Sequence, residues 1–321
     1  MQWVVYGAGA VGGVLGGLLY DAGHDVVLVA RGEHLTAIRD RGLTVESPTG
    51  SANLPVPAAG CAAEVDWSQP SVVLLAVKSH QTAAALTDLV AAAPEATPVV
   101  SVQNGVANEP AALRWFPAVY GVCVMMPTGH LEPGVVEAHC TPVPGILDVG
   151  AFPSGVDDTA RSVAEGFVSA GFVSEPRPNI MAWKHRKLVM NLANAVQACC
   201  ASGPAADELR ERVRAEGEIV LAAAGVEVVS EAEDRIRRGD ILRTGQIAGR
   251  ERSGGSTWQS LRRGTGAVES DYLNGEVALL GRLHGIATPA NALMQRTAAR
   301  LARERSGPGS LDPADLLAQL G

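Results

Sequence analysis

The stretch that most restricts the fold lies at the N-terminus, where the glycine-rich motif GAGAVG directly follows a short apolar run. The run, QWVVY at residues 2–6, has the length and composition of a buried strand. A helical spacing of Val11, Leu15 and Leu18 begins inside the motif, and a second apolar run, VVLVA, ends at residue 30. Strand, glycine turn, helix and strand within about thirty residues predict a βαβ unit of the dinucleotide-binding type.

Each glycine of the motif has its own task in such a unit. Gly7 permits the sharp turn, Gly9 lets the backbone approach a pyrophosphate, and Gly12 allows close packing of helix on strand. The helix N-terminus then offers free N–H groups and the positive end of its dipole to the phosphates. The alternative is a tightly packed glycine turn without a ligand. The motif residues expected at the cofactor are Gly7, Ala8, Gly9, Ala10, Val11 and Gly12.

The residue after the second strand selects the cofactor. NAD sites place a carboxylate there for the ribose hydroxyls, whereas NADP sites often place an arginine for the 2′-phosphate. Here the strand runs into Arg31, and the nearest acid, Glu33, comes two residues later. We therefore expect NADP(H). The alternatives are that Arg31 is a solvated loop charge, or that Glu33 recognises the ribose.

Two further apolar runs end at polar residues that could reach the same ligand. SVVLLAV leads into Lys78, and TPVVSVQ leads into Asn104. Ligands of open parallel sheets bind beyond the carboxyl ends of the strands. We therefore expect Lys78 and Asn104 at the edge that carries Gly7 and Arg31; otherwise they are a loop cation and a turn residue. Later strands, joined by an EPG turn, are expected to extend the sheet antiparallel.

From Ile180 onward the pattern is helical, and residues 181–200 carry a polar stripe on an otherwise apolar helix. At ~100° per residue its four members fall on one face. Burying an unpaired polar group costs about 1–3 kcal/mol, so the stripe should face a partner or a ligand. The alternative is a pair of lysines that snorkel at a domain edge. The stripe consists of Lys184, Lys187, Asn191 and Asn194.

Two more residues of the second half could carry chemistry. Ser256 is expected as the N-cap of a short helix, and Glu269 in the first turn of another. Either could also contact a ligand. The charged, glycine-containing segment 230–255 is expected to be a helix plus a loop. The predicted division is an NADP-binding domain at residues 1–175 and a helical substrate domain at 176–321.

Composition limits the partners. The 321 residues are 47% apolar and 19% charged, which is typical of a globular chain of roughly two domains. A net charge of −8 argues against general affinity for nucleic acid or anionic membranes. Five cysteines without CxxC spacing, and histidines without metal-ligand spacing, predict no disulfide framework, no metal site and a reducing cytoplasm.

As a set, these motifs resemble those of the ketopantoate reductases, the 2-dehydropantoate 2-reductase family. The resemblance runs over nearly the whole chain and is carried by GAGAVG, Arg31, AVKSHQT, QNGV, EPGVV, KLVMN and ESDYLNG followed by HGIATP. It implies an α/β fold, with an N-terminal Rossmann-type dinucleotide-binding domain and a C-terminal all-helical domain. It also implies NADPH and a small 2-oxo acid bound in a cleft.

The resemblance further implies roles for individual residues. The lysine before Leu188, Lys187, matches the family's proton donor, with Lys184 one turn away as the alternative. The family's further asparagine, four residues after Asn191, falls on Ala195. The implied catalytic residues are Lys187, Glu269 and Asn104, and the implied substrate contacts are Lys187, Asn191 and Ser256. Asn194, adjacent to Ala195 but off the family register, is expected as a further substrate contact because it belongs to the polar stripe. The implied cofactor contacts outside the glycine motif are Arg31, Lys78, Asn104 and Glu269.

The expected reaction is reduction of a 2-oxo acid, foremost 2-dehydropantoate, to the 2-hydroxy acid by NADPH. One alternative is an opine-type or other hydroxy-acid dehydrogenase on the same frame. Another, from a different class, is an NADP(H)-binding redox sensor without turnover. The expected partner is a small molecule, with neither nucleic acid nor membrane, and a homodimer is left open.

Overall fold

The computed structural model describes residues 1–248 and 254–321. By its internal contacts the chain forms two compact units. Unit 1 comprises Met1–Gln103, Asn108–Met181 and Ala232–Arg252, and unit 2 comprises Asn104–Ala107, Ala182–Glu231 and Ser253–Gly321. The contacts therefore divide the chain at Met181 and return the segment 232–252 to unit 1. The division into functional domains at residue 175 stays a prediction.

Unit 1 is built on a seven-stranded sheet in the order β12-β8-β7-β6-β1-β2-β5. Every neighbouring pair is parallel except β12, which runs antiparallel to β8. The strand order turns back at β1, which is the topology of a doubly wound nucleotide-binding sheet. The strands are β1 (Gln2–Tyr6), β2 (Val26–Val29), β5 (Ala58–Ala59), β6 (Ser71–Leu75), β7 (Val99–Ser101), β8 (Val119–Met125) and β12 (Ile146–Ala151).

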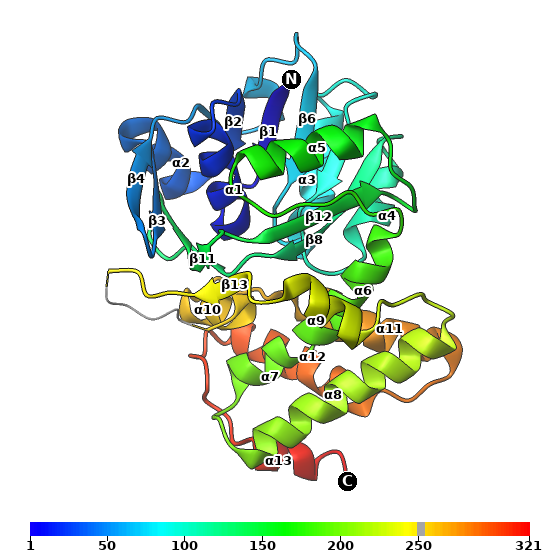
Figure 1. The fold of residues 1–321 in the computed structure, drawn as a ribbon. Coiled ribbons are helices and arrows are strands. Elements are labelled where there is room, and N and C mark those ends of the chain that lie inside the picture. The colour runs from blue at the N-terminus through cyan, green and yellow to red at the C-terminus, as the bar shows by residue number, and fades with distance from the viewer. Residues whose placement is uncertain (249–253) are drawn as a thin grey trace. The chain divides into compact units, whose positions relative to one another are not determined.

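Helices cover both faces of this sheet (Figure 1). Apolar residues of α1 and α5 pack on one face, and those of α3 and α4 on the other, so the sheet is buried on both sides. The helices are α1 (Ala10–Asp21), α2 (Gly32–Arg41), α3 (Thr82–Val90), α4 (Asn108–Leu113) and α5 (Asp158–Ser169), with short 3-10 turns η1 (Ala62–Glu64) and η2 (Ser79–Gln81).

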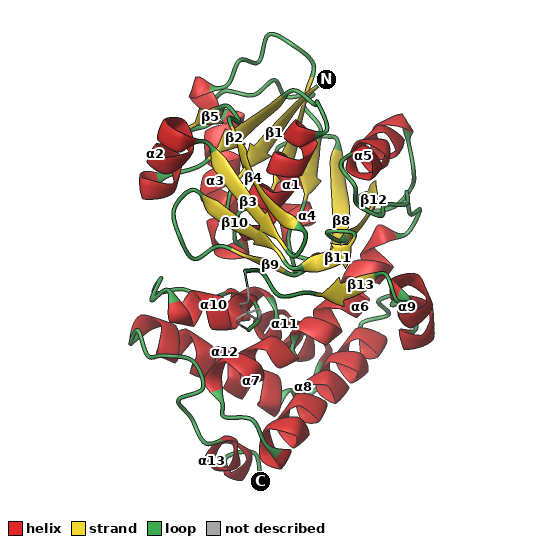
Figure 2. Cartoon of the chain, turned by 60° about the vertical axis from the view of Figure 1, so that its left-hand side comes forward, coloured by secondary structure: helices red, strands yellow, loops and turns green. Residues whose placement is uncertain are grey.

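A second sheet of four strands lies beside α1, in the order β4-β3-β10-β9 (Figure 2). Its strands are β3 (Leu43–Ser47), β4 (Gly50–Leu54), β9 (Thr128–Gly129) and β10 (Val135–Ala138). The EPG turn joins β9 to β10, so the prediction that it joins strands of the main sheet is wrong. The antiparallel extension itself is confirmed, because β12 pairs with β8.

The segment predicted as helix plus loop contains a strand as well as a helix. After α9 (Glu231–Arg238), the strand β13 (Leu242–Thr244) pairs antiparallel with β11 (Cys140–Pro142) of unit 1. Gly245 N–H also donates to the His139 carbonyl at 2.8 Å. Local periodicity could not reveal this strand, because its partner lies about a hundred residues earlier in the chain.

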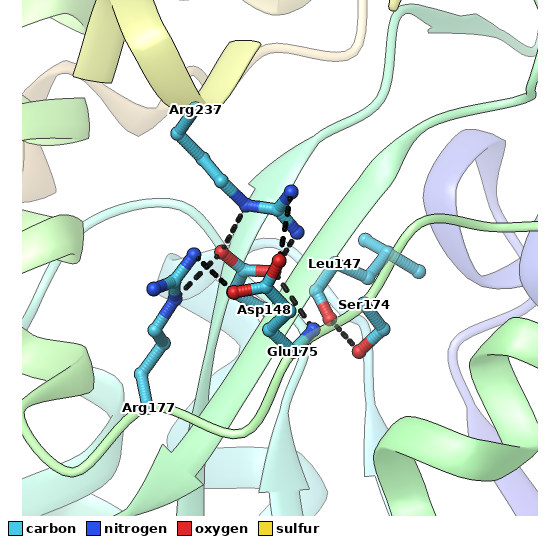
Figure 3. Close-up of polar contacts among 6 residues, drawn as sticks. All are labelled: Leu147, Asp148, Ser174, Glu175, Arg177 and Arg237. Atoms are coloured by element: carbon cyan, nitrogen blue, oxygen red, sulfur yellow. Dashed lines mark hydrogen bonds and ion pairs between the residues drawn. The ribbon is translucent and has the colours of Figure 1, made fainter. Parts of the chain in front are cut away.

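A buried carboxylate holds this segment in place (Figure 3). The Asp148 side chain is 3% exposed and accepts from Arg237 at 2.6 Å and from Arg177 Nε at 3.1 Å. The Glu175 backbone N–H donates to it at 2.9 Å. The hydrogen bond that Arg237 donates to Asp148 raises the pKa of the Arg237 guanidinium above its ordinary value. Two cations and an amide thus compensate the buried charge.

Unit 2 is helical. In it α12 packs on α7, α8 and α11, while α10 packs on α7 and α13 on α8. The helices are α6 (Ile180–Asn191), which begins in unit 1, α7 (Ala193–Cys199), α8 (Pro204–Ala223), α10 (Ser256–Arg262), α11 (Asn274–His284), α12 (Pro289–Arg303) and α13 (Pro313–Ala318), with the 3-10 turn η3 (Glu269–Tyr272).

Two local expectations for unit 2 are wrong. The stripe helix is interrupted at Leu192, whose carbonyl accepts a hydrogen bond from the Asn274 side chain at 3.1 Å. Ser256 does not cap α10: Gly255 occupies the N-cap, and Ser256 is the first helical residue. At Leu192 the partner is a side chain 82 residues away in sequence, whereas the N-cap of α10 is the glycine immediately before Ser256.

No helix among the described residues has the length and hydropathy needed to cross a bilayer. The five cysteines are free thiols. Burial raises the pKa of the Cys199 thiol to about 12 and that of Cys200 to about 11.

Candidate active site

The glycine-rich turn connects β1 to α1 and lies at the point where the strand order turns back. Gly7 has φ +108°, and a Cβ on it would come within 2.8 Å of the Val77 backbone nitrogen. A Cβ on Gly12 would overlap the Gly7 carbonyl oxygen and lie 2.9 Å from Ala76 Cβ. These two glycines are therefore required by backbone conformation and by packing.

Gly9 is different, because packing does not require it. A Cβ placed there would have no atom of the described residues within 4 Å. Gly9 is the N-cap of α1, so the open space borders the free N–H groups of the first helical turn. The residues present thus fit a pyrophosphate, which needs a bare backbone in front of a helix N-terminus.

His34 contacts the backbone of this turn at Ala8, and no motif in the sequence indicates this role. Its Nδ1 accepts from Gly134 N–H at 2.9 Å, so the ring proton lies on Nε2, which donates to the Ala8 carbonyl at 2.7 Å. Its ring also lies 4.2 Å from that of His130. Burial lowers the pKa of His34, which favours this neutral form. His34 lies three residues after Arg31, but nothing local indicates its partners.

Arg31 follows β2 as predicted and is exposed, while Glu33 lies in the first turn of α2. The guanidinium Nη2 donates to the Tyr6 hydroxyl at 3.3 Å, and that hydroxyl donates to Asp88 at 2.5 Å. No motif in the sequence indicates a role for the Tyr6 hydroxyl or for Asp88 at this site. Arg31 is therefore an exposed cation that donates a hydrogen bond to the buried residue Tyr6.

Lys78 lies three residues after the end of β6, the neighbour of β1, and is half-buried. Its loop rests on a buried amide, Gln103, which donates to the Val77 carbonyl at 2.8 Å and to Thr82 Oγ1 at 2.9 Å. Asn108 adds a bond to Ser79 Oγ at 3.2 Å. These side chains, which the sequence reading passed over, determine the path of the loop that carries Lys78.

Asn104 follows β7, and the contacts of residues 104–107 assign them to unit 2. Its Oδ1 accepts from Asn191 Nδ2 at 3.1 Å. Gly105 has φ +80°, and a Cβ on it would lie 2.9 Å from the Tyr272 carbonyl of η3. The QNG glycine therefore allows Asn104 to reach the polar stripe while its loop presses against η3.

Glu269 begins η3 and is 6% exposed, and Ser256 donates to its carboxylate at 3.3 Å. Asn194 lies beside the start of α10, since a Cβ on Gly255 would come 3.7 Å from its Oδ1. Unit 2 thus brings four predicted residues together in two pairs, Asn104 with Asn191 and Ser256 with Glu269. The loop contact between Gly105 and η3 joins the two pairs.

The two lysines of the stripe differ in burial. Lys184 is 3% exposed, whereas Lys187 is half-buried. Lys187 lies one turn before Asn191 on the same face of α6. Of the two lysines, Lys187 is therefore the nearer along α6 to the Asn104–Asn191 pair, and Lys184 is about one turn farther away.

Comparison with known families accounts for most of the chain. A family model described as "Ketopantoate reductase PanE/ApbA" matches residues 3–154, and the model of its C-terminal domain matches residues 179–302. The chain belongs to the ketopantoate reductase family. This confirms the resemblance and the predicted fold class, and it makes the chain an oxidoreductase of CH–OH groups.

Individual members of the ketopantoate reductase family match over nearly their whole length. The 2-dehydropantoate 2-reductase of Pyrococcus horikoshii is 31% identical over 97% of this chain and 100% of its own. That of Caulobacter vibrioides is 32% identical over 90% of this chain and 95% of its own.

Solved structures agree on the fold. A PanE/ApbA family ketopantoate reductase from Ralstonia eutropha has a TM-score of 0.80 at 28% identity, covering 95% of this chain and 99% of its own. A D-mandelate dehydrogenase, solved with NADH and anilino(oxo)acetate, has the same fold with a TM-score of 0.80 at 20% identity, over 96% of this chain and 100% of its own.

Proposed function

We propose that this protein reduces a small 2-oxo acid with NADPH, and that 2-dehydropantoate is its substrate. One observation carries the proposal. A chain that is 31% identical to a 2-dehydropantoate 2-reductase also has Asn104, Asn191, Ser256 and Glu269 paired in one unit, next to Lys187 on α6. Such a set of hydrogen-bonding groups suits a polyfunctional acid that carries a carboxylate, a ketone and a hydroxyl.

The proposed cofactor site is the glycine turn of unit 1. The bare backbone at Gly9 and the N-terminus of α1 would bind the pyrophosphate. Arg31 would bind the 2′-phosphate, since guanidinium groups pair with phosphate through several N–H donors. Lys78, after the strand next to β1, would add a positive charge on the same side of the sheet.

When bound, the reduced nicotinamide supplies a hydride to the ketone carbon. Lys187 would donate a proton to the carbonyl oxygen, on which negative charge develops, and its own charge would stabilise that oxygen. Asn191 and Ser256 would hold the carboxylate or hydroxyl of the substrate, with Asn194 beside them. The Asn104 side-chain amide would orient the substrate and the carboxamide of the nicotinamide. Glu269 would orient a hydroxyl group of the substrate or the cofactor.

The cytoplasm stays the proposed compartment, because five free thiols suit a reducing environment. A homodimer is proposed as the assembly, and light scattering of the purified protein would test it.

The decisive experiment follows oxidation of NADPH and NADH with a panel of 2-oxo acids that includes ketopantoate, pyruvate and phenylglyoxylate. We expect the highest kcat/KM for ketopantoate with NADPH, and a loss of turnover in the matched variant Lys187→Ala. Preference for phenylglyoxylate would instead favour a different hydroxy-acid dehydrogenase. Binding of NADPH without turnover of any acid would favour the redox sensor.

A further inference from the structure

We propose that Tyr6 and Asp88 are positioning residues that hold Arg31 for a 2′-phosphate and so strengthen the preference for a phosphorylated dinucleotide. The inference rests on the proposed function, in which Arg31 binds that phosphate. Neither residue belongs to the glycine motif, and both lie in unit 1 with Arg31.

Tyr6 is the last residue of β1, immediately before Gly7. Its neighbours in register are aliphatic, Val29 on β2 and Leu75 on β6. The Tyr6 residue is 1% exposed and packs in the core on the α3 face of the sheet. The Tyr6 ring therefore fills the same position in the core as the aliphatic side chains on the two neighbouring strands. Its hydroxyl is the additional group, and it contacts Arg31.

The hydrogen bonds around the hydroxyl have a defined direction. The Tyr6 hydroxyl donates to Asp88 Oδ2 at 2.5 Å, and the Ala62 backbone N–H donates to the same oxygen at 2.8 Å. Burial and the bond to Asp88 raise the pKa of Tyr6 to about 12, so the phenol keeps its proton. Since that proton is committed to Asp88, the hydroxyl oxygen can only accept from Arg31 Nη2, at 3.3 Å.

This arrangement suits an arginine that must meet a phosphate. A guanidinium has five N–H donors, and within the described residues Tyr6 accepts from only one nitrogen of the exposed Arg31 side chain. A direct salt bridge between Arg31 and Asp88 would compete with the phosphate. Instead, the Tyr6 hydroxyl lies between the guanidinium and the carboxylate and forms a hydrogen bond with each. Anchoring an exposed, flexible side chain before binding also lowers the entropy lost when the ligand arrives.

The test uses two ligands that differ by the 2′-phosphate, adenosine 2′,5′-bisphosphate and AMP, with affinities measured by titration calorimetry. Tyr6→Phe keeps the ring and removes the hydroxyl. We expect its affinity for the bisphosphate to fall about three- to tenfold, as for one hydrogen bond, and its affinity for AMP to stay unchanged. In turnover, KM for NADPH should rise by a similar factor while kcat stays within about twofold.

The chain offers a matched control in Tyr120. Its hydroxyl donates to Asp157 at 2.7 Å, it is also buried, and its pKa is also raised to about 12. Tyr120→Phe removes the same kind of bond in the same unit. We expect a similar loss of thermal stability and no change in the affinity for either ligand.

A double-mutant cycle separates the inference from the proposed function. In an Arg31→Ala background, Tyr6→Phe should have no further effect on the bisphosphate. If Arg31→Ala leaves the ratio of the two affinities unchanged, the NADPH preference of the proposed function is wrong. If Arg31→Ala lowers that ratio but Tyr6→Phe behaves like Tyr120→Phe, or weakens both ligands equally, the positioning role alone is overturned.

Discussion

The glycine turn of unit 1 and the polar cluster of unit 2 are assembled in opposite ways. The turn consists of six consecutive residues, whose shape follows from backbone contacts at Gly7 and Gly12. The polar cluster draws on four separate segments, joined by the hydrogen bonds Asn104–Asn191 and Ser256–Glu269. Damage to the turn should therefore appear in cofactor binding and stability, and damage to the cluster in turnover of the substrate.

The largest expected effect comes from the polar stripe. Lys187→Ala should lower kcat about 10²–10⁴-fold, as loss of a general acid does, while NADPH binding by fluorescence stays unchanged. Lys184→Ala is the matched control and should cost much less, because one ammonium suffices at the carbonyl oxygen. A severe loss in Lys184→Ala with a mild one in Lys187→Ala would move the proton donor by one helical turn.

Unit 1 also contains a buried network of side chains, which is centred on Asp148. Asp148→Asn leaves Arg177 and Arg237 facing a neutral amide, so we expect a loss of about 3–5 kcal/mol in the free energy of unfolding. The exposed pair Arg39–Glu64 is the control, and Glu64→Gln should cost much less, because solvent screens an exposed ion pair. Urea unfolding measures both; equal losses would show that burial does not govern the effect.

Two glycines of the turn should differ in whether their substitution affects stability or only cofactor binding. Gly12→Ala overlaps the Gly7 carbonyl and should lower the free energy of unfolding by about 1–3 kcal/mol, together with cofactor affinity. Gly9→Ala meets open space, so its thermal midpoint should stay near wild type while NADPH affinity falls. Unchanged NADPH affinity in Gly9→Ala would mean that no pyrophosphate approaches there.

The smallest expected effect concerns His34. Burial holds its folded-state pKa below the ordinary 6.5, so near and below pH 6.5 the unfolded chain binds a proton that the folded chain does not. The stabilisation is complete above pH 6.5 and decreases as the pH falls toward the folded-state pKa. Unfolding midpoints measured against pH should therefore show a shallower slope in His34→Gln than in wild type. Equal slopes would contradict this role.

The sequence correctly predicted β1, the turn, α1 and β2, because each has a local signal in glycine placement or apolar periodicity. It did not predict β13, since a three-residue strand exists only through its pairing with β11. It also missed the interruption at Leu192, whose carbonyl accepts from Asn274, and the N-cap of α10, which is Gly255. The contacts of Tyr6, His34 and Asp148 were equally invisible, because their partners lie far along the chain.

The sequence by itself therefore determined the family, the fold class and the residue types available for chemistry. Motif spacing and periodicity express local backbone geometry, which neighbouring residues control. The tertiary structure alone decided that Asn104 packs with unit 2, that Ser256 donates to Glu269 instead of capping its helix, and that Arg31 is anchored on Tyr6. The physical reason is that a side-chain hydrogen bond depends on distance in space, and residues 87 apart in sequence, such as Asn104 and Asn191, become neighbours only when the chain folds.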